Sequence, residues 1–132
     1  EPVTFVDIDF PMFRLADIYL MYAECAARTG QNMSAGVGYF NLIRERAYGN
    51  SSMNISSLNL QEILDERARE LYGEGHRRSD LIRYGQFTGG DYLWLFKGDE
   101  QFGASTSSHY DLYPIPSADV LSNQNLVQNP GY

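Results

Sequence analysis

The densest group of side chains able to do chemistry lies in residues 66–85, which read ERARELYGEGHRRSDLIRYG. Nine charged residues and one histidine, His76, occupy these positions, and arginines alternate with carboxylates. Such a cluster suits an active site, an anion or nucleic-acid site, or the polar scaffold of a packed helical domain. The net charge of -7 disfavours nucleic acid, because an acidic chain repels phosphates. The spacing of the residues separates the other two interpretations.

Metal binding and proton transfer both fit this spacing poorly. Glu66, Glu70 and Glu74 recur every four residues and therefore lie along one side of a helix. A carboxylate-bridged metal pair needs Glu-x-x-His, whereas His76 follows Glu74 by two residues and His109 is isolated. A hydrolase needs a protonated carboxylic acid, and the neighbouring arginines keep these carboxylates ionised. The chain has no phosphate-loop, dinucleotide or zinc-protease motif. We expect no metal, no cofactor and no catalytic residue.

The cluster instead predicts ion pairs between helices. Arg67, Glu70 and Glu74 lie at the edge of the apolar stripe of their helix, where an unpaired charge would cost several kcal/mol. Arginine, which outnumbers lysine nine to one, suits such fixed pairs with carboxylates. The predicted network comprises Glu24, Arg44, Arg46, Arg67, Glu70, Glu74, Arg77, Asp80 and Arg83.

Apolar periodicity predicts the elements that position these charges. Residues 12–29 predict a helix that is apolar almost all round, except for a polar stripe of Arg14, Asp17, Glu24 and Arg28, and we expect it to be buried within a bundle. A second helix is expected over residues 35–47 with Ser34 as its N-cap, and a third begins after Asn59. RRSDLIRYG predicts a short fourth helix or a turn. The single cysteine, Cys25, falls within the first apolar pattern, and we expect a buried, inert thiol.

These elements divide the chain into an extended lead-in (1–11), a helical core (12–85), a long irregular loop (86–112) and an extended tail (113–132). YPIP, at 113–116, favours extended backbone because proline fixes φ and restrains the residue before it. No stretch approaches the length of a membrane-spanning helix. The turn-rich ending and the start without methionine suggest the C-terminal piece of a longer protein, with any export signal or lipid-anchor cysteine upstream.

Five segments in one order resemble the C-terminal part of the SusD/RagB family of nutrient-binding lipoproteins. They are RLADIYLMYAECAARTG (14–30), YFNLIRERA (39–47), ILDERARELYGEGHRRSDLIRYG (63–85), YPIP (113–116) and QNPGY (128–132). The first two predicted helices also resemble a tetratricopeptide unit. The chain departs from the family pattern at Arg78 and Ser79, where aromatics are usual, and at Tyr84, which replaces a common tryptophan.

The resemblance implies an all-α fold of tetratricopeptide-like helix pairs, with a long irregular loop and an extended C-terminal tail. It further implies a lipid-anchored outer-membrane protein on the cell surface that captures glycans, or in some members peptides. Its partner would be a TonB-dependent, SusC-like transporter, and it would be no enzyme. The alternative is a tetratricopeptide-type protein–protein scaffold without a glycan role; a hydrolase ranks third.

Flat aromatic faces beside hydrogen-bonding groups would bind sugar rings. The loop offers YLWLF at 92–96, in which Tyr92 and Trp94 are the candidate ligand-binding residues. Two interpretations stay open. The run lies at a glycan site or a transporter interface, or it packs onto the helices as a small second core.

Overall fold

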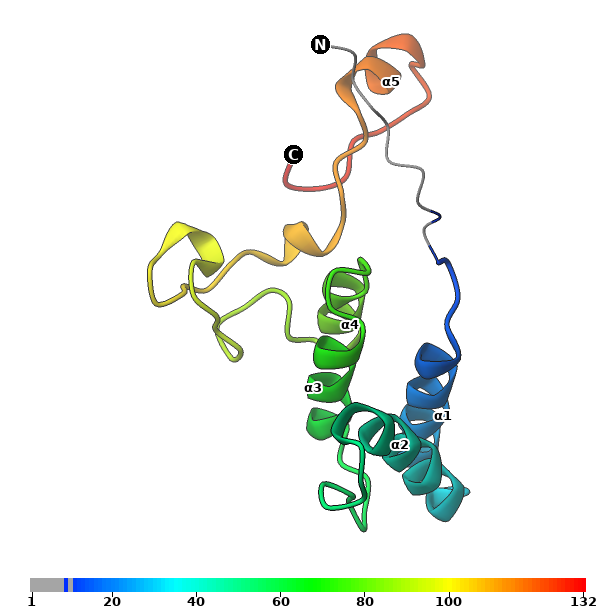
Figure 1. The fold of residues 1–132 in the computed structure, drawn as a ribbon. Helices are drawn as coiled ribbons and strands as arrows, with labels where there is room; N and C mark the ends of the chain where they lie inside the picture. Colours follow the sequence, from blue (N-terminus) through cyan, green and yellow to red (C-terminus); the bar gives the residue numbers. More distant parts are fainter. Residues whose placement is uncertain (1–8, 10) are drawn as a thin grey trace, which may run out of the picture. The chain divides into compact units, whose positions relative to one another are not determined.

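The computed structural model describes residue 9 and residues 11–132 of the chain. Throughout these residues the regular structure is helical and no strand forms, which confirms the predicted all-α class; an isolated bridge joins Gly89 and Thr106 (Figure 1). The elements are α1 (Leu15–Thr29), α2 (Met33–Tyr48), α3 (Leu60–Glu70), α4 (Arg77–Arg83), the 3₁₀ turns η1 (Lys97–Asp99) and η2 (Ser108–Asp111), and α5 (Ser117–Ser122).

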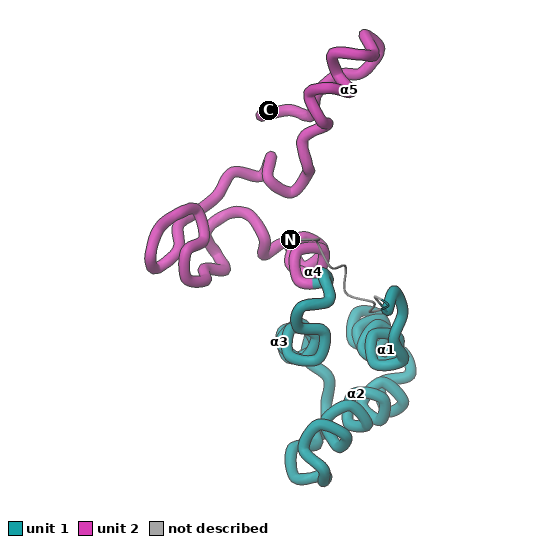
Figure 2. Tube along the Cα trace, turned by 45° about the horizontal axis from the view of Figure 1, so that its top comes forward, with its two compact units in different colours: residues 1–76 teal, residues 77–132 magenta. Residues whose placement is uncertain are grey.

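The chain divides into two compact units, residues 1–76 and residues 77–132 (Figure 2). The first contains α1, α2 and α3, and the second contains α4, the loop region and α5. The boundary therefore falls inside the range 12–85 that the sequence presents as one helical core.

In the first unit α1 packs against both α2 and α3. Its core joins Leu20 of α1, Phe40 of α2 and Ile63 of α3, each with no exposed surface. Gly36 allows the close approach of α2, since a Cβ there would lie 2.7 Å from Leu58 Cδ1 and 2.9 Å from Ala26 Cβ. Small residues and one contiguous apolar core thus hold the three helices together.

The helix ends follow local backbone chemistry. Asn59 caps α3 as predicted, because its side chain accepts hydrogen bonds from the backbone N–H groups of Gln61 and Glu62. Gly30 ends α1 in the left-handed conformation, with φ of 70°. The predicted Ser34 cap is wrong: α2 begins two residues earlier than expected, at Met33, and Asn32 occupies the N-cap position with left-handed backbone.

Two burial predictions for α1 are also wrong. The helix is not buried all round, since Leu15 is 63% exposed and Ile18 is 46% exposed. Cys25 is exposed as well, because it follows two buried residues, Ala23 and Glu24, and turns away from the core. Apolar side chains all round a helix therefore do not mean that neighbouring elements cover every side of it.

The C-terminal motifs of the second unit bind each other. Gln128 donates to the Ile115 carbonyl and accepts from the Ile115 N–H, both at 2.8 Å, while Asn129 donates to the Tyr113 carbonyl at 2.7 Å. The hydroxyl of Tyr132 donates to the Leu112 carbonyl at 2.8 Å. QNPGY therefore supplies the side chains that satisfy the backbone around YPIP. The tail is not extended throughout, because α5 forms directly after Pro116.

Candidate functional site

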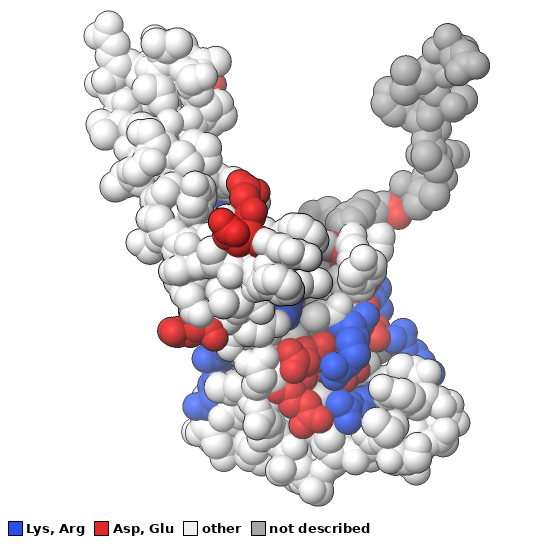
Figure 3. All heavy atoms as spheres, turned by 90° about the vertical axis from the view of Figure 1, so that its left-hand side faces the viewer, with Lys and Arg blue, Asp and Glu red and all other residues white. Residues whose placement is uncertain are grey.

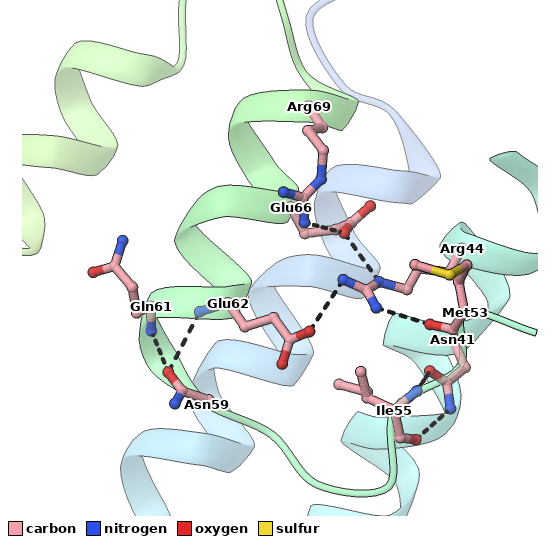
Figure 4. A network of polar contacts seen from close by, with 9 residues as sticks. All are labelled: Asn41, Arg44, Met53, Ile55, Asn59, Gln61, Glu62, Glu66 and Arg69. Atoms are coloured by element: carbon pink, nitrogen blue, oxygen red, sulfur yellow. Dashed lines mark hydrogen bonds and ion pairs between the residues drawn. The ribbon is translucent and has the colours of Figure 1, made fainter. Parts of the chain in front are cut away.

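The predicted charged residues form several separate groups, and the first surrounds Arg44. Its guanidinium donates to Glu66 and Glu62, each at 3.1 Å, and to the Met53 carbonyl at 2.8 Å (Figure 4). Arg69 donates to the same Glu66 carboxylate at 2.7 Å. Because the Arg44 and Glu66 side chains are only 10% and 5% exposed, this group links α2, α3 and the segment between them from the inside.

Arg14, directly before α1, organises a second group. It donates to the Glu70 carboxylate and carbonyl, both at 2.8 Å, and to Glu74 at 2.9 Å. Arg46 of α2 forms a further ion pair with Glu70. Hydrogen bonding from Arg14 lowers the pKa of Glu74, and the two carboxylates raise the pKa of Arg14. The Glu74 carboxylate is therefore held ionised, which suits a structural role and not proton donation.

The remaining charges pair in three further places. Asp17 of α1 and Arg67 of α3 form a buried pair at 2.8 Å, with side chains 8% and 4% exposed. Three predicted members, Glu24, Asp80 and Arg83, pair within their own helices. Glu24 pairs with Arg28, and Asp80 pairs with Arg83, each at 2.7 Å. Arg77 donates to the Tyr92 hydroxyl at 2.9 Å.

The single network of the prediction is thus a set of local groups, and four of the important members were missing from it: Arg14, Asp17, Glu62 and Glu66. The polar stripe of the first helix was the signal for two of them, since Arg14 and Asp17 are the stripe residues that reach α3. Figure 3 likewise shows acidic and basic side chains lying beside one another. In the portion of the chain that is described, no three His, Cys, Asp or Glu residues are placed to hold a metal ion.

The second unit holds a pocket of about 690 Å³, which we call the aromatic pocket. Ser105, Thr106 and Ser107 contribute to its wall. Its rings come from the loop and from the C-terminal motifs: Phe87, Trp94, Phe96, Tyr110, Tyr113 and Tyr132. The pocket combines flat apolar faces with hydroxyl groups, which is the surface that a sugar ring requires.

The two predicted ligand-binding residues are neighbours, but only one of them lines the aromatic pocket. Trp94 lines the aromatic pocket, whereas Tyr92 lines an adjoining pocket of about 370 Å³ that shares Trp94. Their ring centroids are 6.0 Å apart, and the Phe87 ring stacks near Trp94 at 6.1 Å. Tyr92 and Trp94 are both half-buried, while Phe96 is 69% exposed. The YLWLF run is therefore partly buried in the loop region and partly exposed to a ligand.

The backbone of the loop fixes the position of Trp94. Its carbonyl accepts a hydrogen bond from the Lys97 N–H at 3.1 Å. Gly103, with φ of 83°, passes so close that a Cβ there would lie 2.5 Å from the same carbonyl oxygen. The Lys97 ammonium lies 4.7 Å from the Trp94 ring and donates to the Tyr92 carbonyl at 2.7 Å. Sequence reasoning missed Lys97 and Arg78, the two cations that line the aromatic pocket.

Comparison with known proteins now bears on these two units. A family model described as "SusD family" matches residues 3–132. The chain belongs to the SusD family. The resemblance inferred from the five segments is confirmed, and the match extends over both units. The alternative of a tetratricopeptide-type scaffold without glycan binding is not favoured by this finding.

Among curated members of the SusD family, the chain is 46% identical over 129 residues to the starch-binding protein SusD of Bacteroides thetaiotaomicron. It is 46% identical over 79 residues to the SusD-like protein P25 of Formosa agariphila. These matches cover 98% and 56% of the chain, respectively, but only 22% and 15% of the relatives. The chain thus spans about a fifth of the length of the starch-binding protein SusD and less of P25.

A solved structure supports the fold. A SusD-like protein of Bacteroides fragilis superposes with a TM-score of 0.67 at 23% identity, covering 93% of the chain and 26% of that protein. The arrangement of helices described above is therefore that of the SusD family. In the described part of the chain, the helices are too short or too polar to cross a membrane.

Proposed function

We propose that the chain forms part of a cell-surface protein that binds an oligosaccharide and delivers it to a TonB-dependent, SusC-like transporter in the outer membrane. The observation that carries the proposal is 46% identity, over 98% of the chain, to a protein named for starch binding. The proposal includes attachment to the outer membrane by a lipid anchor upstream of these residues, and a role in binding without catalysis.

The aromatic pocket is the proposed place of binding on this chain. Trp94 and Phe96 offer faces for a sugar ring, and the hydroxyl groups of residues 105–107 offer hydrogen bonds. The charged groups of the first unit serve a different purpose, because their carboxylates are already bonded to arginines. They stabilise the helices of the first unit.

Glycan binding by the full-length protein tests the proposal. The protein is applied to an array of neutral and acidic oligosaccharides, and the affinity for the best ligand is then measured for Trp94→Ala and for Tyr72→Ala. Tyr72 is the matched control, since its side chain is 89% exposed and belongs to the first unit. We expect Trp94→Ala to weaken binding by at least about tenfold, as loss of a large aromatic contact does, and Tyr72→Ala to change little.

Two results would count against the proposal. One is that no oligosaccharide binds, or that a folded Trp94→Ala protein binds as tightly as the wild type. The other is release of new reducing ends from a bound oligosaccharide, which would make the protein an enzyme.

A further inference from the structure

The aromatic pocket is lined by two cations that differ from most others in the chain. Seven arginines each pair with a carboxylate: Arg14, Arg28, Arg44, Arg46, Arg67, Arg69 and Arg83. Arg78 and Lys97 have no such partner among the residues that the structure describes, although the chain carries an excess of acidic residues. Unpaired positive charge is thus concentrated at one pocket.

Arg78 is held in place without being neutralised. Its Nη2 donates to the Tyr110 carbonyl at 2.6 Å and to the Asp111 carbonyl at 3.3 Å. Its guanidinium carbon lies 3.8 Å from the centre of the Tyr113 ring and 4.9 Å from that of Phe87. These contacts use Nη2 and place the guanidinium over two rings, so Nε and Nη1 have no acceptor in the described part of the protein. Each of these two nitrogens can therefore still donate a charge-assisted hydrogen bond to a carboxylate.

Lys97, a buried residue of the pocket wall, adds to the positive potential of the aromatic pocket. It is the only lysine of the chain and is 3% exposed, yet its ammonium bonds to a neutral acceptor, the Tyr92 carbonyl, and faces the Trp94 ring. A buried cation without a counterion favours a nearby anion, because solvent screens it weakly.

Two carboxylates, those of Asp99 and Asp111, lie near the pocket without forming an ion pair with either cation in the described part of the chain. Asp99 also lines it but is exposed, so solvent screens its carboxylate. The Asp111 carboxylate accepts a hydrogen bond from the Thr88 hydroxyl at 3.1 Å and forms no ion pair with Arg78. Its buried Oδ1 has no hydrogen-bond partner, so this carboxylate offsets part of the positive charge. The lining itself still carries two cations, Arg78 and Lys97, against one exposed carboxylate, which favours a ligand that brings a negative charge.

We propose that the aromatic pocket selects acidic oligosaccharides, with a uronic acid carboxylate bound by Arg78 and a sugar ring against Trp94. This inference rests on the proposed function, since it names the class of oligosaccharide for the same pocket. A neutral sugar would leave the positive charge of Arg78 without a counterion, whereas a uronate would accept a charge-assisted hydrogen bond from its Nε–H or Nη1–H.

The test compares two ligands with the same sugar backbone, one with charged carboxylates and the other with neutral methyl esters. Trigalacturonic acid and its methyl ester are titrated into the full-length wild-type protein by calorimetry, at low and at high NaCl. We expect the acid to bind about tenfold more tightly than the ester, and this preference to shrink as salt rises. No variant is needed for this comparison, so a folding defect cannot obscure it.

Variants then assign the preference to Arg78. We expect Arg78→Gln to bind the acid and the ester equally, while the matched change Arg69→Gln, at a 51% exposed side chain of the first unit, keeps the preference. Equal affinity of the wild type for acid and ester would overturn the inference. So would binding of neither ligand by a protein that binds a neutral oligosaccharide through Trp94, and that result would leave the proposed function intact. Absence of any Trp94-dependent binding would overturn both.

Discussion

Replacing Asp17 by asparagine tests whether the charged residues stabilise the first unit. The change keeps the shape of the side chain and removes the negative charge that Arg67 binds at 2.8 Å. Both residues are deeply buried, at 6% and 4% exposure, so the variant leaves a buried arginine without its carboxylate. Breaking a buried pair in this way costs about 3–5 kcal/mol. We expect about 3 kcal/mol, because the asparagine oxygen still accepts a hydrogen bond.

Urea unfolding followed by far-ultraviolet circular dichroism measures this loss, and an unchanged slope shows that the same transition is compared. Asp91→Asn is the control: Asp91 is exposed, and the change there should stay within about 0.5 kcal/mol. The double variant Asp17→Leu with Arg67→Met removes both charges and should recover much of the loss. A cost for Asp17→Asn no larger than that of the control would refute the reasoning.

Three further predictions concern other parts of the chain. Arg14 lowers the pKa of Glu74 in the folded protein, so the ionised carboxylate stabilises the fold at pH values above its unfolded pKa, near 4.5, and this contribution is lost as the pH falls below that value. Glu74→Gln should therefore flatten the dependence of the unfolding free energy on pH in this range. An unchanged pH dependence would contradict the prediction. Gly103→Ala should displace the Trp94 backbone and shift its fluorescence, whereas an unaltered spectrum would show that the loop tolerates a Cβ. Gln128→Ala removes the hydrogen bonds to the 113–116 segment and should raise its hydrogen exchange; unchanged protection would refute this.

Local signals in the sequence predicted the helices well and their partners poorly. Asn59 and Gly30 mark helix ends because a cap and a left-handed stop act on adjacent backbone. Ser34 failed as a cap because Asn32, two residues earlier, adopts the left-handed conformation and begins the helix sooner. Such boundaries depend on competition between neighbours that propensity alone does not resolve.

The sequence marked several charges that need partners, but it did not show which residues pair with one another. The pattern placed Glu70 and Glu74 at the edge of the apolar stripe, but their partner Arg14 lies 56 and 60 residues away in the chain. Which cation reaches them depends on how α1 packs against α3, and that packing is set by the shared core. The aromatic pocket shows the same limit: Trp94 was a candidate, whereas the role of Arg78 depends on hydrogen bonds to carbonyls more than thirty residues later.

Fluorescence of Trp94 tests most directly whether the aromatic pocket binds oligosaccharide. Trp94 is the only tryptophan of this chain, and subtraction of a Trp94→Phe spectrum isolates its signal in the full-length protein. We predict that a bound oligosaccharide shifts the emission to shorter wavelength and protects Trp94 from acrylamide, with a midpoint that matches the calorimetric affinity. Saturable binding of the oligosaccharide in calorimetry, with no change in the Trp94 emission, would contradict the account.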